Sequence, residues 1–312
     1  MKFHSSITLN IKGTEMKILF LKNGFMLMTL SAFFFAVTDI FIKFMSPSIG
    51  IVQIAFVRFI LGAILLWPMI ISTGQSLKGN STRVLLIRGL TGTVAFFCLL
   101  KSISMIPLSN AMVLFYTFPL FAAFFSFILF KEKFKMIEII LIVIGAIGIY
   151  ILINPSSNSY STGHLFGILA GCFAGLTVVL IRNLRKSNGS LIIYFYFCIV
   201  GGLISFPFIV VKFSVPNYGQ IFLLATLAVI FLIAQLLMNQ GFKFCKASEG
   251  GVILMSEVVF TGIAGVIMFN DLLSGTFLAG SLLIVASGVG LNFINRAAGH
   301  SDNTPNIKKE SK

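Results

Sequence analysis

The stretch Gly24–Thr38, GFMLMTLSAFFFAVT, returns in altered form 139 positions later as Gly163–Thr177, GHLFGILAGCFAGLT. The two stretches align without a gap. The same shift brings further pairs into register, namely Gly62 with Gly201, Pro68 with Pro207, Ser109 with Ser248, Phe121 with Phe260, and Glu132 with Asp271. Many membrane carriers are built from a duplicated hydrophobic unit. The repeat therefore predicts a chain made of two copies of one unit.

The composition places both copies in a membrane. The chain of 312 residues is 57% hydrophobic and only 10% charged, with a mean hydropathy of +1.02. Soluble domains carry about 25% charged residues, and a spanning helix needs about 20 mostly apolar residues. Runs such as 137–144 and 199–211 lack the alternation of a membrane β-barrel. We place ten spans, at 24–43, 50–71, 83–104, 109–130, 137–154, 163–182, 190–211, 219–241, 248–269 and 274–294.

We therefore expect an all-α membrane protein whose ten transmembrane helices form two five-helix repeats. An odd number of spans per repeat inverts the second copy in the bilayer, and an inverted pair can open to either side. The first repeat covers 24–154 and the second covers 163–296, with an outer linker at 155–162. The remaining segments are a cytosolic N-terminal segment at 1–23 and a disordered cytosolic tail at 297–312.

The distribution of positive charge predicts the orientation. The net charge of +14 could indicate nucleic acid, but 18 of the 23 lysines and arginines fall in segments that share one side of the membrane. Only Lys43 and Lys212 flank outer loops. This is the positive-inside pattern, so both termini are predicted to be cytosolic, in the inner (plasma) membrane of a bacterium. No cleavable signal peptide is evident, and Met16 is an alternative start.

One stretch of the first repeat resembles a known family. It contains Arg88-Gly89-Leu90, then 106–111 (IPLSNA), 117–121 (TFPLF) and 130–133 (FKEK). These residues resemble the EamA repeat of the drug/metabolite transporter superfamily. In the second copy, 247–251 (ASEGG) and 269–271 (FND) fit the same pattern. The second copy departs from it by carrying Val258 where the first has Pro119. The resemblance implies a transporter with two five-helix repeats, and it leaves the substrate open.

A narrower resemblance concerns a subgroup. Thr38-Asp39 followed by Lys43, Arg58-Phe59, Arg88-Gly89 and Glu257-Val258 look like the bacterial S-adenosylmethionine uptake carriers. The resemblance implies uptake of that metabolite as one reading of the function. Export of amino acids, other metabolites or drugs is the alternative.

Among the ionisable residues within spans, Glu257 is the most informative. It lies near the middle of the ninth span, where a charge costs roughly 2.5–3.5 kcal/mol on insertion scales. Such a carboxyl group can bind a cationic part of a substrate or carry a coupling proton. A hydrogen bond that only fixes helix packing is the competing interpretation.

A second candidate group combines Asp39, Arg58 and Lys101. Asp39 lies about 22 Å along the first span, and Arg58 lies about 12 Å below the outer start of the second. The two can share a depth, so we expect an Asp39–Arg58 ion pair, either in the binding site or as a structural or outer latch. Lys43 and Lys101 could compete for Asp39, or Lys101 could extend outward to the membrane surface.

Four further residues complete the candidate binding set, and one proline is a candidate hinge. Arg88 lies near the inner end of the third span, where it either binds substrate or reaches lipid phosphates. Tyr116 adds a hydroxyl group in the fourth span, and Gln235 and Asn239 present amides on one face of the eighth. Pro119 should kink the fourth span. Convergent polar groups among aromatic side chains are typical of small-molecule sites.

These features favour a secondary transporter of a small metabolite that works by alternating access, over an intramembrane enzyme. The three histidines do not lie deep in a span, and the four cysteines lack metal-ligand spacing. The sequence has no P-loop and no recognisable nucleophile–base pair. We therefore predict no catalysis, cofactor, metal or nucleic-acid partner. Small residues in the fifth and tenth spans permit close helix contact, either as a scaffold or in a homodimer.

Overall fold

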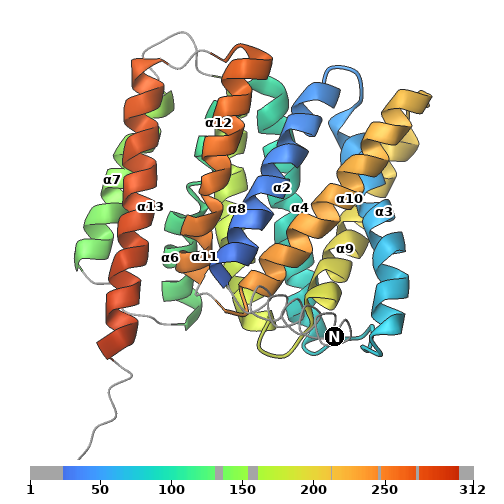
Figure 1. Ribbon diagram of the computed structural model, residues 1–312, viewed down its shortest axis with the longest axis horizontal. Coiled ribbons are helices and arrows are strands. Elements are labelled where there is room, and N and C mark those ends of the chain that lie inside the picture. Colours follow the sequence, from blue (N-terminus) through green and yellow to red (C-terminus); the bar gives the residue numbers. More distant parts are fainter. Residues whose placement is uncertain are drawn as a thin grey trace, which may run out of the picture.

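The protein folds into a bundle of helices that run side by side (Figure 1). The computed structural model describes residues 24–130, 136–153, 161–211, 213–244, 247–271 and 274–301, and all regular secondary structure in these ranges is helical. Large apolar side chains such as Leu203 (69% exposed) and Ile267 (74% exposed) face outward, as lipid-facing positions should. The prediction of an all-helical membrane protein is confirmed.

Helices occur at all ten predicted positions. In the first repeat they are α2 (Gly24–Met45), α3 (Ile51–Ser72), α4 (Thr82–Met105), the pair α5 (Leu108–Phe115) and α6 (Phe118–Phe130), and α7 (Met136–Ile153). In the second repeat they are α8 (Thr162–Leu184), α9 (Ser190–Val211), α10 (Tyr218–Gly241), the pair α11 (Ala247–Leu254) and α12 (Ser256–Phe269), and α13 (Gly275–Ser301). Seven segments of the described chain are long and apolar enough to cross a membrane. The full count of ten spans stays a prediction.

Two differences from the predicted boundaries concern the ends of the second repeat. Ser161 lies in the predicted linker, where it caps α8 by accepting a hydrogen bond from the Gly163 N–H at 3.0 Å. At the other end, α13 continues through Ala297 to Ser301, although the tail from 297 was predicted to be disordered. Ala297 and Ala298 favour helix, so the polarity of the tail alone did not predict where α13 ends. The predictions for 1–23, for Met16 and for the tail beyond Ser301 lie outside the described residues.

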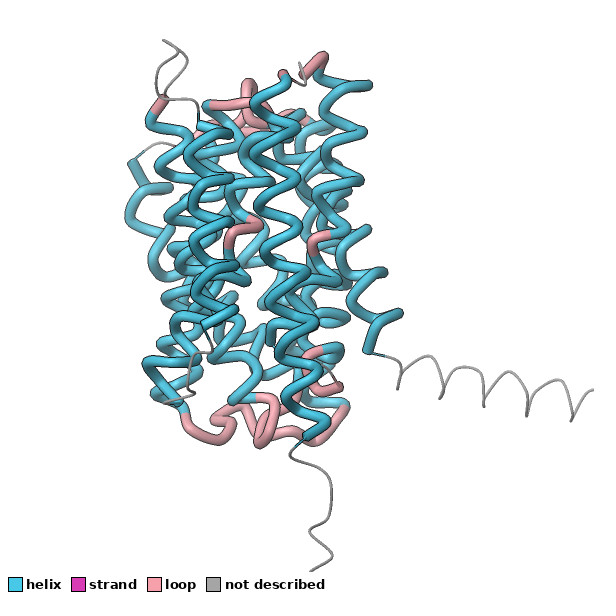
Figure 2. The backbone as a smooth tube through the Cα atoms, turned by 90° about the vertical axis from the view of Figure 1, so that its left-hand side faces the viewer, coloured by secondary structure: helices cyan, strands magenta, loops and turns pink. Residues whose placement is uncertain are grey.

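The most distinctive feature of the fold is an interruption in one helix of each repeat. The fourth predicted span breaks at Tyr116–Thr117 and the ninth breaks at Met255, which are equivalent positions under the 139-residue shift. Both breaks lie midway along the bundle (Figure 2). The break in the first repeat lies beside Pro119, where a kink was expected. The second break has Val258 at the equivalent position, so proline is not required for it.

The packing of the two repeats on each other has a twofold pattern. Helix α2 packs on α10 and α4 packs on α8, while α3 packs on α9 and α7 on α13. Each interrupted pair also contacts the first helix of the other repeat, so α5 and α6 lie against α8, and α11 and α12 lie against α2. Exchanging the two repeats reproduces all of these contacts. The α7–α13 contact uses the small residues that the sequence singled out, because Gly148 approaches the Gly280 backbone.

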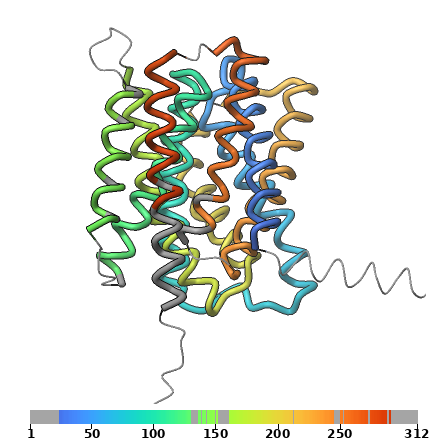
Figure 3. The backbone as a smooth tube through the Cα atoms, turned by 60° about the vertical axis from the view of Figure 1, so that its left-hand side comes forward, coloured from blue at the N-terminus to red at the C-terminus, as the bar shows by residue number. Residues whose placement is uncertain are grey.

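The first and last described helix ends lie together. The beginning of α2 and the end of α13 lie at the same end of the bundle (Figure 1), and α2 can be seen to begin at this end in Figure 3 as well. The described connections at 73–81 and 185–189 lie at this end too (Figure 1). They carry positive charge, with Lys78 in the first connection and Arg185 and Lys186 in the second. We refer to this end as the basic end of the bundle.

Candidate transport site

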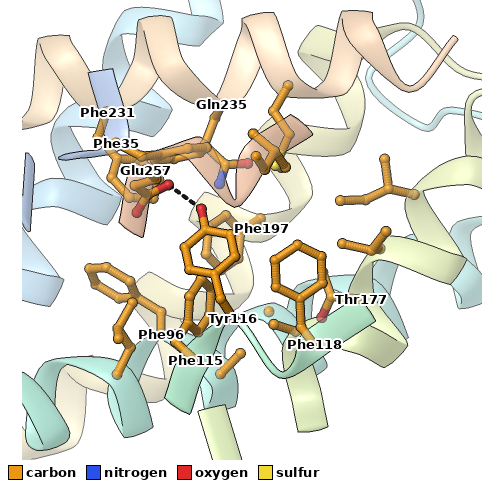
Figure 4. Close-up of a pocket in the computed structure, with 18 of the residues that line it drawn as sticks. Phe35, Phe96, Phe115, Tyr116, Phe118, Thr177, Phe197, Phe231, Gln235 and Glu257 are labelled. Carbon is orange, nitrogen blue, oxygen red and sulfur yellow. Dashed lines mark hydrogen bonds between the residues drawn. The ribbon is translucent and has the colours of Figure 1, made fainter. Parts of the chain in front are cut away.

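A cavity of about 110 Å³ lies between the two repeats and is lined by residues of both. Figure 4 shows that the labelled polar and aromatic side chains converge on it from several helices. The aromatic residues that line it are Phe35, Phe96, Phe115, Phe118, Phe197 and Phe231. Its polar lining consists of Asp39, Arg88, Tyr116, Thr177, Gln235 and Glu257. Five of the predicted site residues therefore line one cavity, namely Asp39, Arg88, Tyr116, Gln235 and Glu257.

Both breaks place functional groups at this cavity. Tyr116 is the C-cap residue that follows α5, and its hydroxyl donates a hydrogen bond to Glu257 Oε2 (Figure 4). Glu257 lies in the first turn of α12, immediately after the second break. A helix N-terminus has exposed N–H groups and a positive partial charge, which favour a carboxylate. The interruption therefore makes it less costly to hold an acidic side chain deep in the bundle.

The Glu257 carboxyl group has a second acidic neighbour. The carboxyl groups of Asp39 and Glu257 both line the cavity and are near enough to interact electrostatically, and both side chains are buried, with 4% and 3% of their surface exposed. Asp39 Oδ2 has no hydrogen-bond partner among the described residues. Two neighbouring carboxylates repel each other, so a shared proton or a bound cation would stabilise the pair.

The other charged group of the cavity is Arg88. Its Nη2 donates a hydrogen bond to Gln235 Oε1 at 3.2 Å, which joins α4 to α10. The guanidinium carbon also lies 4.4 Å from the centre of the Phe197 ring. Arg88 is 1% exposed, so it points into the bundle and does not reach outward to lipid phosphates. The cavity therefore carries acidic groups from α2 and α12 and a basic group from α4.

The predicted ion pair between Asp39 and Arg58 was wrong. Asp39 interacts with Glu257, whereas Arg58 lies among aromatic rings, with its guanidinium carbon 3.8 Å from the Phe96 ring centre and 4.0 Å from that of Phe231. Its three guanidinium nitrogens have no hydrogen-bond partner within the described chain. Similar depth along two helices allowed the pair, but depth does not show which faces of the helices meet.

Two other predicted residues lie apart from the cavity. Lys101 is exposed, which agrees with the interpretation that it extends outward. Asn239 is fully buried but does not line the cavity, and its Nδ2 donates to the Ser190 carbonyl at 3.4 Å. The i,i+4 spacing with Gln235 placed both amides on one side of α10. It could not show that the cavity ends between them.

Lys43 also contacts other partners than Asp39. Its Nζ donates hydrogen bonds of 2.8 Å to the carbonyl groups of Ile103 and Ile106, at the end of α4. Nearby, Asp271 Oδ2 accepts hydrogen bonds from the backbone N–H and the hydroxyl of Ser109, at 3.1 and 2.8 Å. These contacts join α2 to the end of α4, and the chain just after α12 to the start of α5, at the end of the bundle opposite the basic end. We call Lys43, Ser109 and Asp271 the outer contact.

Some features of the site were missed in the sequence, although their signals were present. Gly163, Gly167, Gly171 and Gly175 recur every four residues along α8. At Gly171 an added Cβ would lie 2.5 Å from Thr117 Oγ1 and 2.9 Å from the Phe115 carbonyl oxygen. Small residues at this spacing permit close helix approach, and here they hold α8 against the first break. Thr177, which lines the cavity, was noticed only as the repeat partner of Thr38.

Comparison with known proteins agrees with this architecture. Residues 22–154 and 161–293 each match the EamA-like transporter family. The chain belongs to this family. The two matches cover both repeats. Among the residues that the structure describes, we find no group of three His, Cys, Asp or Glu side chains that could hold a metal ion.

Several characterised relatives of this EamA family member are transporters. The pseudopaline exporter CntI of Pseudomonas aeruginosa (strain UCBPP-PA14) is 28% identical over 274 residues, covering 87% of this chain and 96% of the relative. Solute carrier family 35 member G1 of Homo sapiens is 27% identical, covering 84% and 76%. The S-adenosylmethionine uptake transporter of Rickettsia prowazekii (strain Madrid E) is 22% identical, covering 84% and 90%. The protein is therefore a membrane transporter.

A solved crystal structure shares the fold. It superposes with a TM-score of 0.62 at 15% sequence identity, covering 87% of this chain and 98% of the other. Likeness at this identity concerns the arrangement of helices alone.

Proposed function

We propose that this protein is a secondary transporter that moves a small organic metabolite across the bacterial inner membrane by alternating access. The observation that carries the proposal is the position of Glu257, which faces the cavity from the broken end of α12 and meets Asp39 and Tyr116 there. Interrupted helices whose ends face a central site are a recurrent feature of secondary transporters. Ten spans, inverted repeats and cytosolic termini are part of this proposal.

We assign the Asp39–Glu257 pair the role of binding either a cationic group of the solute or a coupling proton. Two neighbouring buried carboxyl groups hold a proton more readily than two separate ones, because only one can ionise at low cost. A cation that enters the cavity replaces this proton electrostatically. The Tyr116 hydroxyl, which donates to Glu257, keeps the carboxylate oriented in either state.

The outer contact supports alternating access. At one end of the bundle, hydrogen bonds of Lys43 join α2 to the end of α4, and those of Asp271 join the chain just after α12 to the start of α5. Opening toward that side requires these bonds to break, and they are local enough to be replaced by water. The cavity of about 110 Å³ is smaller than the roughly 300–1,000 Å³ of typical ligand pockets. A whole metabolite therefore requires the helices around the cavity to separate.

Two directions of transport are open to this architecture. The relative from Rickettsia takes up S-adenosylmethionine and the relative from Pseudomonas exports pseudopaline. S-adenosylmethionine uptake is our first candidate, and export of amino acids or other metabolites is the alternative. An intramembrane enzyme is the competing class, and it has less support, because the relatives named above are transporters.

The test is transport into proteoliposomes with and without a pH gradient, using S-adenosylmethionine first and then a panel of amino acids. We compare the wild type with Glu257→Gln, Glu257→Ala and Lys101→Gln, the last being a matched control that removes an exposed charge. We expect both Glu257 variants to lose at least about tenfold in transport, which corresponds to about 1.4 kcal/mol, while Lys101→Gln retains it.

The Glu257→Gln variant separates the two roles of the carboxyl group. If it couples protons, the variant loses accumulation driven by the pH gradient but keeps exchange of solute. If it binds a cationic group, the variant loses both. Full gradient-driven transport by a well-folded Glu257→Gln protein would remove Glu257 from the mechanism.

A further inference from the structure

Two buried arginines share one aromatic ring beside the cavity. The guanidinium carbon of Arg58 on α3 lies 5.1 Å from the centre of the Phe197 ring, and that of Arg88 on α4 lies 4.4 Å from it. The two charges are close enough to repel each other. Arg58 is completely buried and Arg88 is 1% exposed. Two like charges are costly in an apolar interior unless something offsets them.

The two arginines are compensated to different extents. Three rings besides Phe197 surround Arg58, with centres 3.8–4.1 Å from its guanidinium carbon, and cation–π attraction partly replaces the lost hydration. Arg88 contacts the Phe197 ring and one amide oxygen, that of Gln235. The side chain that faces the cavity is therefore the less compensated one.

Hydrogen-bond donors at these arginines are left unused. Arg88 Nε and Nη1, and all three guanidinium nitrogens of Arg58, are buried without an acceptor among the described residues. Arg88 Nη1 lies against Gly92, which lines the cavity. The buried Tyr194 hydroxyl interacts electrostatically with both arginines but likewise has no hydrogen-bond partner among the described residues. Buried polar groups are nearly always paired. The free donors of Arg88, which lines the cavity, therefore indicate a ligand that supplies negative charge and acceptor oxygens there, whereas Arg58 and Tyr194 do not line the cavity and act on it through their charge and dipole.

We propose that Arg88, supported by Arg58 and Tyr194, forms a subsite for an oxyanion, either a carboxylate or a phosphate, carried by the transported solute. The guanidinium group offers a planar fork that binds two oxygens of such a group at once. Arg88 contacts the anion, and Arg58 adds a second positive charge behind the Phe197 ring. The inference rests on the proposed transport function and narrows its substrate. A solute that uses both ends of the cavity carries an anionic group toward Arg88 and a cationic group toward Glu257.

The test measures thermal unfolding of the full chain in detergent with sodium acetate, sodium phosphate or sodium chloride at matched ionic strength. We expect acetate or phosphate to raise Tm by a few degrees in a saturable manner, beyond any effect of chloride. A response to acetate alone assigns a carboxylate, a response to phosphate alone assigns a phosphate, and a response to both supports a general oxyanion subsite.

Variants connect this response to the arginine. Arg88→Gln should abolish the oxyanion response. Arg88→Lys, which keeps the charge without the fork, should weaken the response severalfold, and it takes the place of Arg88→Gln if that variant does not fold. Lys101→Gln is the matched control and should respond as the wild type does. A wild-type response no larger than that to chloride, or an unchanged response in a folded Arg88 variant, would overturn the proposal.

One further variant separates this inference from the proposed function. Glu257→Gln should keep the full oxyanion response while it loses transport. If Glu257→Gln retains transport but the oxyanion response is present and depends on Arg88, the role of Glu257 is wrong and the subsite stands. If transport depends on Glu257 but oxyanions do not bind, the subsite is wrong and the transport function stands.

Discussion

The two interrupted helices have the same geometry but different chemistry. Each packs against the first helix of the other repeat, α5 and α6 against α8, and α11 and α12 against α2. In the first break the residues are Tyr116 and Pro119. At the equivalent places in the second are Met255 and Val258, and Glu257 follows Met255. One architecture thus holds an aromatic donor in one copy and its carboxylate acceptor in the other.

The supporting helices differ in the same manner. Helix α8 presents Gly171 and Gly175 to the first break, whereas α2 carries Ala32 and Ala36 at the equivalent positions. The first break is therefore approached more closely than alanine would permit. The comparison shows that the two repeats have the same break in the backbone at equivalent positions. Later divergence of a few side chains made one cavity with unlike walls.

The largest effect is expected from making the two supports alike. Gly171→Ala installs the residue of the other copy, but its Cβ would lie 2.5 Å from Thr117 Oγ1 and 2.9 Å from the Phe115 carbonyl oxygen. Overpacking of this kind costs about 1–3 kcal/mol. We expect a clear loss of thermal stability in detergent and a loss of transport through displacement of the first break.

The control for this variant is Gly262→Ala on α12, where an added Cβ would meet nothing within 4 Å. It should be neutral. If Gly171→Ala proves as stable and active as Gly262→Ala, then the close approach of α8 is not what holds the first break in place.

A narrower effect, on transport without loss of the fold, is expected from removing the donor that joins the two breaks. Tyr116→Phe keeps the ring but removes the hydroxyl that donates to Glu257. Hydrogen bonds to charged groups contribute about 1.5–3 kcal/mol, so transport at low solute concentration should fall about tenfold or more. Initial rates in proteoliposomes measure this. Tyr218→Phe, at a residue that is 93% exposed, is the matched control, and equal rates for the two variants would show that the Tyr116 hydroxyl has no part in transport.

The smallest effect is expected from exchanging the proline between the copies. Pro119→Val installs the residue of the second break, which is interrupted without proline, so transport should stay within about threefold. Val258→Pro removes one backbone hydrogen bond, from Val258 N–H to the Met255 carbonyl at 3.0 Å, worth about 1 kcal/mol. Transport rates and Tm of both variants measure how far each break depends on proline. A tenfold loss in Pro119→Val would instead support a hinge that depends on proline.

Sequence alone determined the class of the fold and most of the cavity's polar groups. Hydrophobic length and the 139-residue shift predicted helical segments at ten positions, because spans of about 20 apolar residues have few alternatives in a bilayer, but they did not predict the break at Met255. The cost of charge in the membrane identified Asp39, Arg88 and Glu257 as functional candidates. The family resemblance followed from the motifs near Arg88 and Pro119, and the comparison confirmed it.

Only the tertiary structure decided which of these groups meet. Asp39 was expected to pair with Arg58, yet it meets Glu257, while aromatic rings surround Arg58. Periodicity fixes the face of a residue within its own helix, but partners are chosen by the rotation and approach of whole helices. Those depend on contacts such as Gly171 against Thr117, which involve residues far apart in the chain. The sequence therefore determined the spans and their costly charges, and the packing of the two repeats decided how those charges are compensated.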